Sequence, residues 1–290
     1  QNKMDELLSK TLNELTEEEW KQVQQFKNKK KPSINFSKAT YDHCVRPDGL
    51  ALNLDYINVK APSLHIPDDF KTVSPSLWLS EALKKIDQVW VLDNEKACRL
   101  VIDAILTEVL LKNTDTTARH RLWGFCKVKN DWEGTGFGYT GDVDYMLGYS
   151  KFQYVGTMDS SILVVQAKQE WPDSSIAQVL CEAGCLLKKR LAAGKNTPVF
   201  AALTNGLLFR FFAIDVDAIV YASPIVVLNV GDDGTYNSSA SLSEILRWFN
   251  WFITSANSIS SSEDFSVEDS LTQLRNCFGT KNRKKIKIQE

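Results

Sequence analysis

The hydrophobic positions of the chain fall into long stretches with helical spacing. Residues 76–91 repeat Trp, Leu and Ile every three or four positions, which predicts a helix. Residues 95–111 are apolar around most of the helix circumference, so we expect a buried helix with Asp93 as its N-cap. Residues 172–191 predict another helix, which ends at Gly194.

A further helix is predicted from Ser241, because Ser241 and Glu244 have the spacing of a capping box. Its aromatic residues recur at helical spacing, which favours packing in a core over stacking against nucleic-acid bases. These residues are Trp248, Phe249, Trp251 and Phe252.

Short runs rich in β-branched and aromatic residues lie between the helices and predict strands. They are residues 121–128, 142–148, 160–168, 198–203, 207–214 and 225–230. Asn205 and Gly206 separate two of these runs, which is a strong hairpin signal. The glycine-dense residues 134–141 are predicted to form a mobile loop before the second strand.

The predicted order of elements is helix, three strands, helix, two or three strands and helix. This order indicates an α/β fold, in which helices flank a mixed central sheet, over residues 76–258. Residues 1–75 are predicted as an N-terminal extension, which is mostly helical at first and then an irregular, proline-containing wrap. Residues 259–290 are predicted as a linker and a basic tail.

Composition narrows the class of protein. The chain has 290 residues, of which 43% are hydrophobic and 24% charged, as in an ordinary globular protein. The longest apolar runs are too short to span a bilayer, so no membrane partner is expected. No signal peptide is visible, and the six cysteines lack the spacing of a zinc site, which predicts free thiols in an intracellular compartment, cytoplasmic or nuclear.

Charge is nearly balanced, at 34 basic and 36 acidic residues, but basic residues cluster in three places. The runs at 27–31 and 281–287 are read either as solvated tails or as arms that bind phosphate groups. Lys188, Lys189 and Arg190 end the helix at 172–191, where cations also favour the helix dipole.

The candidate chemistry lies on two neighbouring strands. Strand alternation puts Asp142 and Asp144 on one face of the first, and Gln166 and Lys168 on one face of the second. Buried ionisable groups are costly unless they are paired or bind a metal, so the two strands predict a polar site. An internal Asp144–Lys168 ion pair is the simpler alternative.

A divalent-metal site gives this pattern a chemical reason. Carboxylate and amide oxygens suit Mg²⁺ or Mn²⁺, which activates water and neutralises charge on a phosphate. A lysine beside the metal, here Lys168, would orient the nucleophile or stabilise the phosphate.

The residues around Asp144, in Gly141-Asp-Val-Asp, and the run Gln166-Ala-Lys168 resemble the PD-(D/E)xK nuclease superfamily, which includes restriction endonucleases and the nuclease-like domain of type I restriction motor subunits. The resemblance covers about residues 95–214 and implies a restriction-endonuclease-like core in the order α-β-β-β-α-β. The chain is also similar, more loosely, to nuclease-like domains of crinkler-type effectors.

The resemblance implies site residues on both flanking helices. Glu95 is similar to the family's helix glutamate, with Glu108 as the alternative. Gln178 and Glu182 are similar to a Gln-x-x-x-Tyr element in which Glu stands for Tyr, and they share a helix face. Gln166 replaces the second acidic residue of the motif, so it offers an oxygen without a charge.

Together these features predict a nuclease that hydrolyses nucleic acid, DNA before RNA, with Mg²⁺ or Mn²⁺ as cofactor. The predicted catalytic residues are Asp144, Gln166, Lys168, Glu95 and Gln178, of which Asp144, Gln166 and Glu95 bind the metal. The alternative is a catalytically inactive module of the same fold that binds nucleic acid or a protein.

Overall fold

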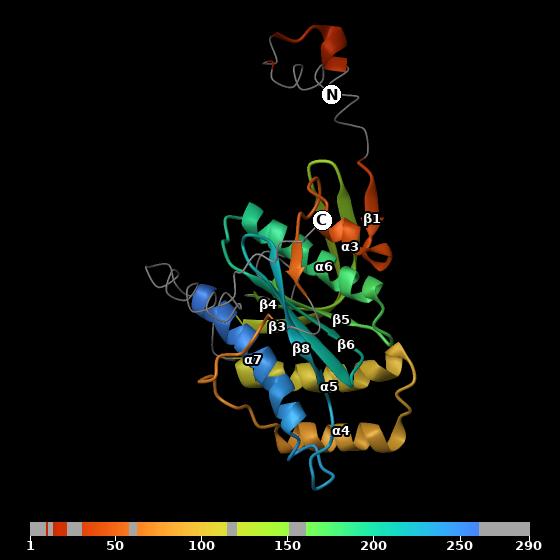
Figure 1. Cartoon of the computed structure of the whole chain (residues 1–290), viewed down its shortest axis with the longest axis vertical. Coiled ribbons are helices and arrows are strands. Elements are labelled where there is room, and N and C mark those ends of the chain that lie inside the picture. Colours follow the sequence, from red (N-terminus) through yellow and green to blue (C-terminus); the bar gives the residue numbers. More distant parts are fainter. Residues whose placement is uncertain are drawn as a thin grey trace, which may run out of the picture.

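The computed structural model describes residues 10, 14–21, 31–57, 63–114, 121–150 and 161–260, and these form a mixed α/β structure (Figure 1). From residue 31 onward its helices are η2 (Phe36–Lys38), α3 (Tyr41–Val45), α4 (Leu77–Val89), α5 (Glu95–Asn113), α6 (Asp173–Ala192) and α7 (Ala240–Ser260). Its strands are β1 (Ser33–Asn35), β2 (Asn53–Tyr56), β3 (Arg121–Glu133), β4 (Gly138–Ser150), β5 (Ser161–Ala167), β6 (Val199–Thr204), β7 (Leu208–Ile214) and β8 (Ile219–Val227).

The strands in this part of the chain form one eight-stranded sheet in the order β1-β4-β5-β6-β7-β8-β2, with β3 paired to β4. β3 and β5 both run antiparallel to β4, whereas β6 runs parallel to β5. The segment from α5 to β6 therefore follows the order helix, three strands, helix, strand. The prediction of a mixed sheet flanked by helices is confirmed at this level.

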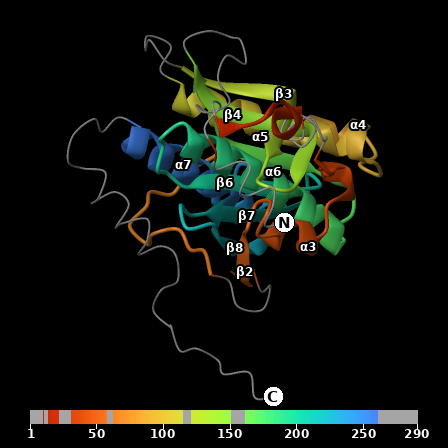
Figure 2. The same cartoon turned by 90° about the horizontal axis from the view of Figure 1, so that it is seen from above.

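The sheet separates two hydrophobic cores, because successive side chains of a strand point to opposite faces. Helices α4, α5 and α7 cover one face, where Tyr145 and Val165 are buried. Helix α6, with α3 and η2, covers the other face, where Met146 and Val164 are buried (Figures 1 and 2). Gln166 has the strand parity of Val164 and lies on the α6 face. The alternation of β4 is interrupted at Asp144, because Val143 and Met146 both belong to the core on the α6 side.

The long helices match their predicted ranges closely, but two N-caps differ from the prediction. Asn94, not Asp93, caps α5, and its side chain accepts a hydrogen bond from the Ala97 N–H at 3.0 Å. Ser239, two residues before the predicted cap, accepts from the Leu242 N–H at 3.0 Å. In both cases the residue three positions before the bonded N–H is the cap, as the geometry of the first turn requires.

The strands depart more from the prediction than the helices do. The hairpin at Asn205-Gly206 is confirmed, with the Asn205 side chain accepting from the Leu208 N–H at 2.7 Å. The glycine-dense loop is shorter than predicted, because Gly138 already pairs with β1 and β3. β8 begins at Ile219, six residues before the predicted strand.

Two short strands, β1 and β2, lie within residues 32–75, where the sequence predicts an irregular wrap. β1 pairs with β4, and β2 pairs with β8, both in parallel. This segment therefore contributes strands to the sheet. The predicted boundaries at residues 75 and 258 stay predictions, and the basic run at 281–287 lies outside the described residues. Among the described residues, no helix has the length and apolar character needed to cross a bilayer.

Candidate active site

Asp144 and Gln166 meet on the adjacent strands β4 and β5, as the sequence predicts. Tyr145 pairs with Val165 across these antiparallel strands, which sets the two polar residues side by side. The Gln166 Nε2 donates to Asp144 Oδ2 at 2.6 Å, and the backbone N–H of Ala167 donates to the same oxygen at 2.9 Å. Both residues are 2% exposed, so this contact is shielded from solvent.

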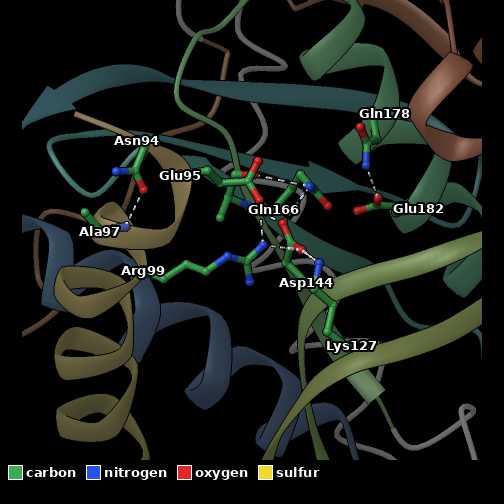
Figure 3. Close-up of polar contacts among 10 residues, drawn as sticks. Asn94, Glu95, Ala97, Arg99, Lys127, Asp144, Gln166, Gln178 and Glu182 are labelled. Carbon is green, nitrogen blue, oxygen red and sulfur yellow. Dashed lines mark hydrogen bonds and ion pairs between the residues drawn. The ribbon is translucent and has the colours of Figure 1, made fainter. Parts of the chain in front are cut away.

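Two cations hold the other oxygen of Asp144 (Figure 3). Arg99 on α5 donates to Asp144 Oδ1 at 2.6 Å, and Lys127 on β3 donates to it at 2.5 Å. Lys127 has a backbone φ of +53°, a left-handed conformation that costs free energy for a residue with a side chain. Backbone strain of this kind concentrates at functional sites, and here it accompanies a cation aimed at the central carboxylate.

The electrostatics of Asp144 follow from these contacts. Burial acts to raise the pKa of the carboxyl, but the hydrogen bonds from Lys127, Arg99 and the Ala167 N–H outweigh it, and the pKa lies below its usual value. Asp144 is therefore ionised near neutral pH, and Arg99 and Lys127 balance its charge. The simpler alternative of an Asp144–Lys168 ion pair is wrong, because these two cations occupy that role instead.

Glu95 reaches the site through Arg99. Its carboxylate accepts from the Arg99 guanidinium at 2.8 Å, one helical turn apart, and its side chain is 41% exposed. Arg99 thus bridges Glu95 and Asp144. The predicted helix acid, Glu95, is therefore linked to the site through Arg99 and does not contact Asp144 directly. Glu108, the alternative helix acid, is not part of this cluster. It lies more than three turns further along α5, where it accepts hydrogen bonds from Ser76, the N-cap of α4.

Lys168 is the first residue after β5 and is half-buried. Its backbone N–H donates to Thr204 O at 2.9 Å, which continues the pairing of β5 with β6 and fixes its position. Its ammonium is close enough to the Glu182 carboxyl to act on the pKa of that group.

Gln178 and Glu182 face the sheet from α6, as their spacing of four residues predicts. The Gln178 Nε2 donates to Glu182 Oε1 at 2.9 Å, and the Glu182 side chain is fully buried. Burial is the main reason why the pKa of Glu182 is raised well above its usual value, and the neighbouring Asp144 carboxylate adds to the effect. Lys168 and Lys127 oppose this shift without reversing it.

Two oxygens of this cluster are buried without a hydrogen-bond partner, namely Gln166 Oε1 and Glu182 Oε2. Orphan acceptors of this kind call for a ligand or an ordered water. No three His, Cys, Asp or Glu side chains within the described ranges are grouped to hold a metal. A metal bound here would need an amide ligand, and the Asp144 and Gln166 oxygens are of the type that Mg²⁺ and Mn²⁺ accept.

Sequence reasoning missed the role of Lys127 and the contact of Arg99 with Asp144. Arg99 carried a signal, because it lies one turn after Glu95 on the same helix face. Lys127 carried none, since its left-handed backbone breaks the alternation from which strand faces are read. The aromatic residues of α7 are core residues as predicted, with Trp248, Phe249, Trp251 and Phe252 each at most 3% exposed.

Comparisons with known proteins add nothing to this picture. Neither the protein-family models nor the curated proteins give a match to the chain.

Proposed function

We propose that the protein is a divalent-metal-dependent nuclease that hydrolyses phosphodiester bonds of nucleic acid, with DNA as the preferred substrate. The observation that carries the proposal is the buried contact of Asp144 with Gln166 on two adjacent strands, with Lys168 as the first residue after the second strand. A buried, ionised carboxylate beside an amide oxygen without a hydrogen-bond partner is suited to holding a cation for phosphate chemistry.

The order of elements supports the same proposal. α5, β3, β4, β5, α6 and β6 follow the order α-β-β-β-α-β that the resemblance to the PD-(D/E)xK nucleases implies. The two strands that carry Asp144 and Gln166 are adjacent in the sheet, and the helices with Glu95 and Gln178 lie on either side of it. A fold hosts many functions, so this agreement supports the proposal and the site carries it.

Asp144 and Gln166 would hold the divalent cation in this proposal, with Glu95 acting through Arg99 rather than binding it directly. A bound cation lowers the pKa of water and neutralises charge that builds on the phosphate. Lys127 is the contact of Asp144 that can yield, because its side chain is 59% exposed whereas that of Arg99 is 18% exposed. Its ammonium would then be free to bind a phosphate group of the substrate.

The remaining residues of the site stabilise the charge on the phosphate or hold the carboxyl groups in position. Lys168 offers an ammonium for the charge of the attacked phosphate, held by the bond of its backbone N–H to Thr204. Arg99 keeps Asp144 ionised and oriented, and Gln178 fixes the Glu182 carboxyl by donating to it. The site thus combines fixed oxygens on the sheet with cations at its edge.

The test is a cleavage assay on plasmid DNA, single-stranded DNA and RNA with Mg²⁺ or Mn²⁺, with EDTA as the metal-free control. We expect metal-dependent cleavage, which Asp144→Asn lowers by about 10²–10³-fold while the circular dichroism spectrum is unchanged. Equal cleavage by a folded Asp144→Asn variant, or cleavage that persists in EDTA, would contradict the proposal.

A second candidate function is a catalytically silent module that binds nucleic acid. The observation that favours it is that both Asp144 oxygens already accept hydrogen bonds from the protein's own donors, while Gln166 adds no charge. For such a module we expect an affinity for DNA that falls as the salt concentration rises, and no cleavage of the DNA. Cleavage gained through Gln166→Glu would then identify the absent charge as the reason for silence.

A further inference from the structure

Glu182 is a buried carboxyl whose contacts leave half of it unsatisfied. It lies on α6 over the sheet, is 0% exposed, and one oxygen accepts from Gln178 at 2.9 Å. The other oxygen, Oε2, has no hydrogen-bond partner. A carboxyl kept only for packing would be replaced at no cost by an apolar side chain, so this one calls for a ligand.

Gln166 presents a second unsatisfied oxygen to the same space. Its Nε2 is used twice, toward Asp144 Oδ2 at 2.6 Å and toward Ala167 O at 3.4 Å. These bonds orient the amide so that Oε1 is left buried and unpaired. Figure 3 shows the Gln166 amide on the sheet turned toward the Glu182 carboxyl on α6.

The chemistry of these atoms selects the ligand. Gln166 Oε1 accepts but cannot donate, and Glu182 Oε2 donates only while the carboxyl carries a proton. A cation that binds between these two oxygens would therefore displace that proton. A carboxylate together with an amide oxygen is a ligand set for a small, hard divalent cation. Asp144, which contacts Gln166 directly, supplies a further carboxylate at the sheet.

We propose that Glu182 is the second acidic ligand of the metal site, and that α6 thereby supplies the charge that Gln166 lacks on β5. Gln166 Oε1 is the neutral ligand of the same cation. This assignment rests on the proposed metal-dependent function, and it adds Glu182 to Asp144 and Gln166 in the ligand set. Glu95 remains the partner of Arg99.

The experiment measures Mn²⁺ binding to the full chain by electron paramagnetic resonance, without any nucleic acid. Glu182→Gln keeps the shape of the side chain and its bond with Gln178, and Glu81→Gln on the exposed face of α4 is the matched control. We expect Glu182→Gln to weaken Mn²⁺ binding at least ~10-fold, since loss of a charged ligand exceeds the effect of an outer contact. Glu81→Gln should bind as the wild type does.

A charge relocation sharpens the test. The double variant Gln166→Glu with Glu182→Gln moves the carboxylate from α6 to β5 and should recover most of the lost affinity. Gln166→Glu alone should bind Mn²⁺ about 10-fold more tightly or better, and it decides the matter if Glu182→Gln does not fold. Unchanged affinity in Glu182→Gln, no recovery in the double variant, or no binding by the wild type would overturn the assignment, with a buried water then bridging the two oxygens.

Cleavage measured on the same samples separates this assignment from the proposed function. Mn²⁺ binding that depends on Glu182, without cleavage by the wild type, supports the metal site and removes the nuclease. Metal-dependent cleavage with unchanged Mn²⁺ affinity and rate in Glu182→Gln removes the role of Glu182 and leaves the nuclease in place.

Discussion

Two glutamates lie buried on opposite sides of the sheet, and their surroundings differ sharply. Glu108 on α5 is 2% exposed, and Glu182 on α6 is 0% exposed. Glu108 accepts from the Ser76 N–H at 2.9 Å and the Ser76 hydroxyl at 2.7 Å, and it pairs with Lys112 at 3.0 Å. Glu182 accepts from Gln178 alone, and its second oxygen has no hydrogen-bond partner.

The difference separates a carboxylate that the fold satisfies from one that we propose as a metal ligand. Burial acts to raise the pKa of Glu108, but Ser76 and Lys112 outweigh it, and the pKa is lowered. The pKa of Glu182 is raised well above its usual value, mainly by burial. The charged form of Glu108 therefore stabilises the native state. Its hydrogen bonds with Ser76 join α5 to the start of α4. The fold disfavours the charged form of Glu182. Such a perturbed pKa is typical of a group that has a functional role.

The largest expected effect on stability is that of Glu108→Ala. It leaves the Ser76 N–H and hydroxyl without their acceptor, so we expect the free energy of unfolding to fall by about 1.5–3 kcal/mol. Urea unfolding followed by tryptophan fluorescence measures this change. A loss below about 0.5 kcal/mol would show that Glu108 is not a structural link.

A smaller loss is expected for Ser76→Ala, which removes the N-cap of α4 together with one donor to Glu108. We expect a decrease of about 1–2 kcal/mol. A double-mutant cycle with Glu108→Ala should give a coupling above about 0.5 kcal/mol. Asn94→Ala, which removes the cap of α5 at 3.0 Å from the Ala97 N–H, is the control and should add independently of Glu108. Full additivity of Ser76 with Glu108 would contradict the link.

The smallest effect has the opposite sign and depends on pH. Because the folded pKa of Glu182 is raised, the native state holds a proton that the unfolded state releases, so stability falls as pH rises above about 4.5. Glu182→Gln removes this loss and should raise Tm by about 2–4 °C at pH 8, with no gain at pH 4. The lowered pKa of Glu108 works the other way, and its contribution disappears as pH falls below about 4.5. Thermal unfolding between pH 4 and pH 8 tests both signs. A Glu182→Gln curve parallel to the wild type would refute the raised pKa.

Much of the helical layer follows from the sequence. α4, α5 and α6 begin within one residue of their predicted starts, because long apolar periods and polar caps define them locally. β1 and β2 could not be predicted in this way. They are three and four residues long, and each is defined by pairing with a strand far along the chain, β4 or β8.

The site residues also differ in how far the sequence predicts their contacts. Asp144 beside Gln166 follows from strand alternation and the order of β4 and β5, and Gln178 beside Glu182 follows from helical spacing. The ion pair of Lys127 with Asp144 depends on a left-handed backbone inside a strand, which no periodicity reveals. The unpaired oxygens of Gln166 and Glu182 are revealed only when α6 is packed on the sheet.

The most direct test compares two lysines, one from each side of the sheet. Lys168 follows β5 in the candidate active site, and Lys112 pairs with Glu108 on α5. The measurement is the rate of DNA cleavage in Mg²⁺ by the variants Lys168→Ala and Lys112→Ala, at a temperature where both are folded. Lys168→Ala should lower the rate by about 10²-fold or more, while Lys112→Ala cleaves as the wild type does. Equal rates for the two variants would contradict the proposed catalytic role of Lys168.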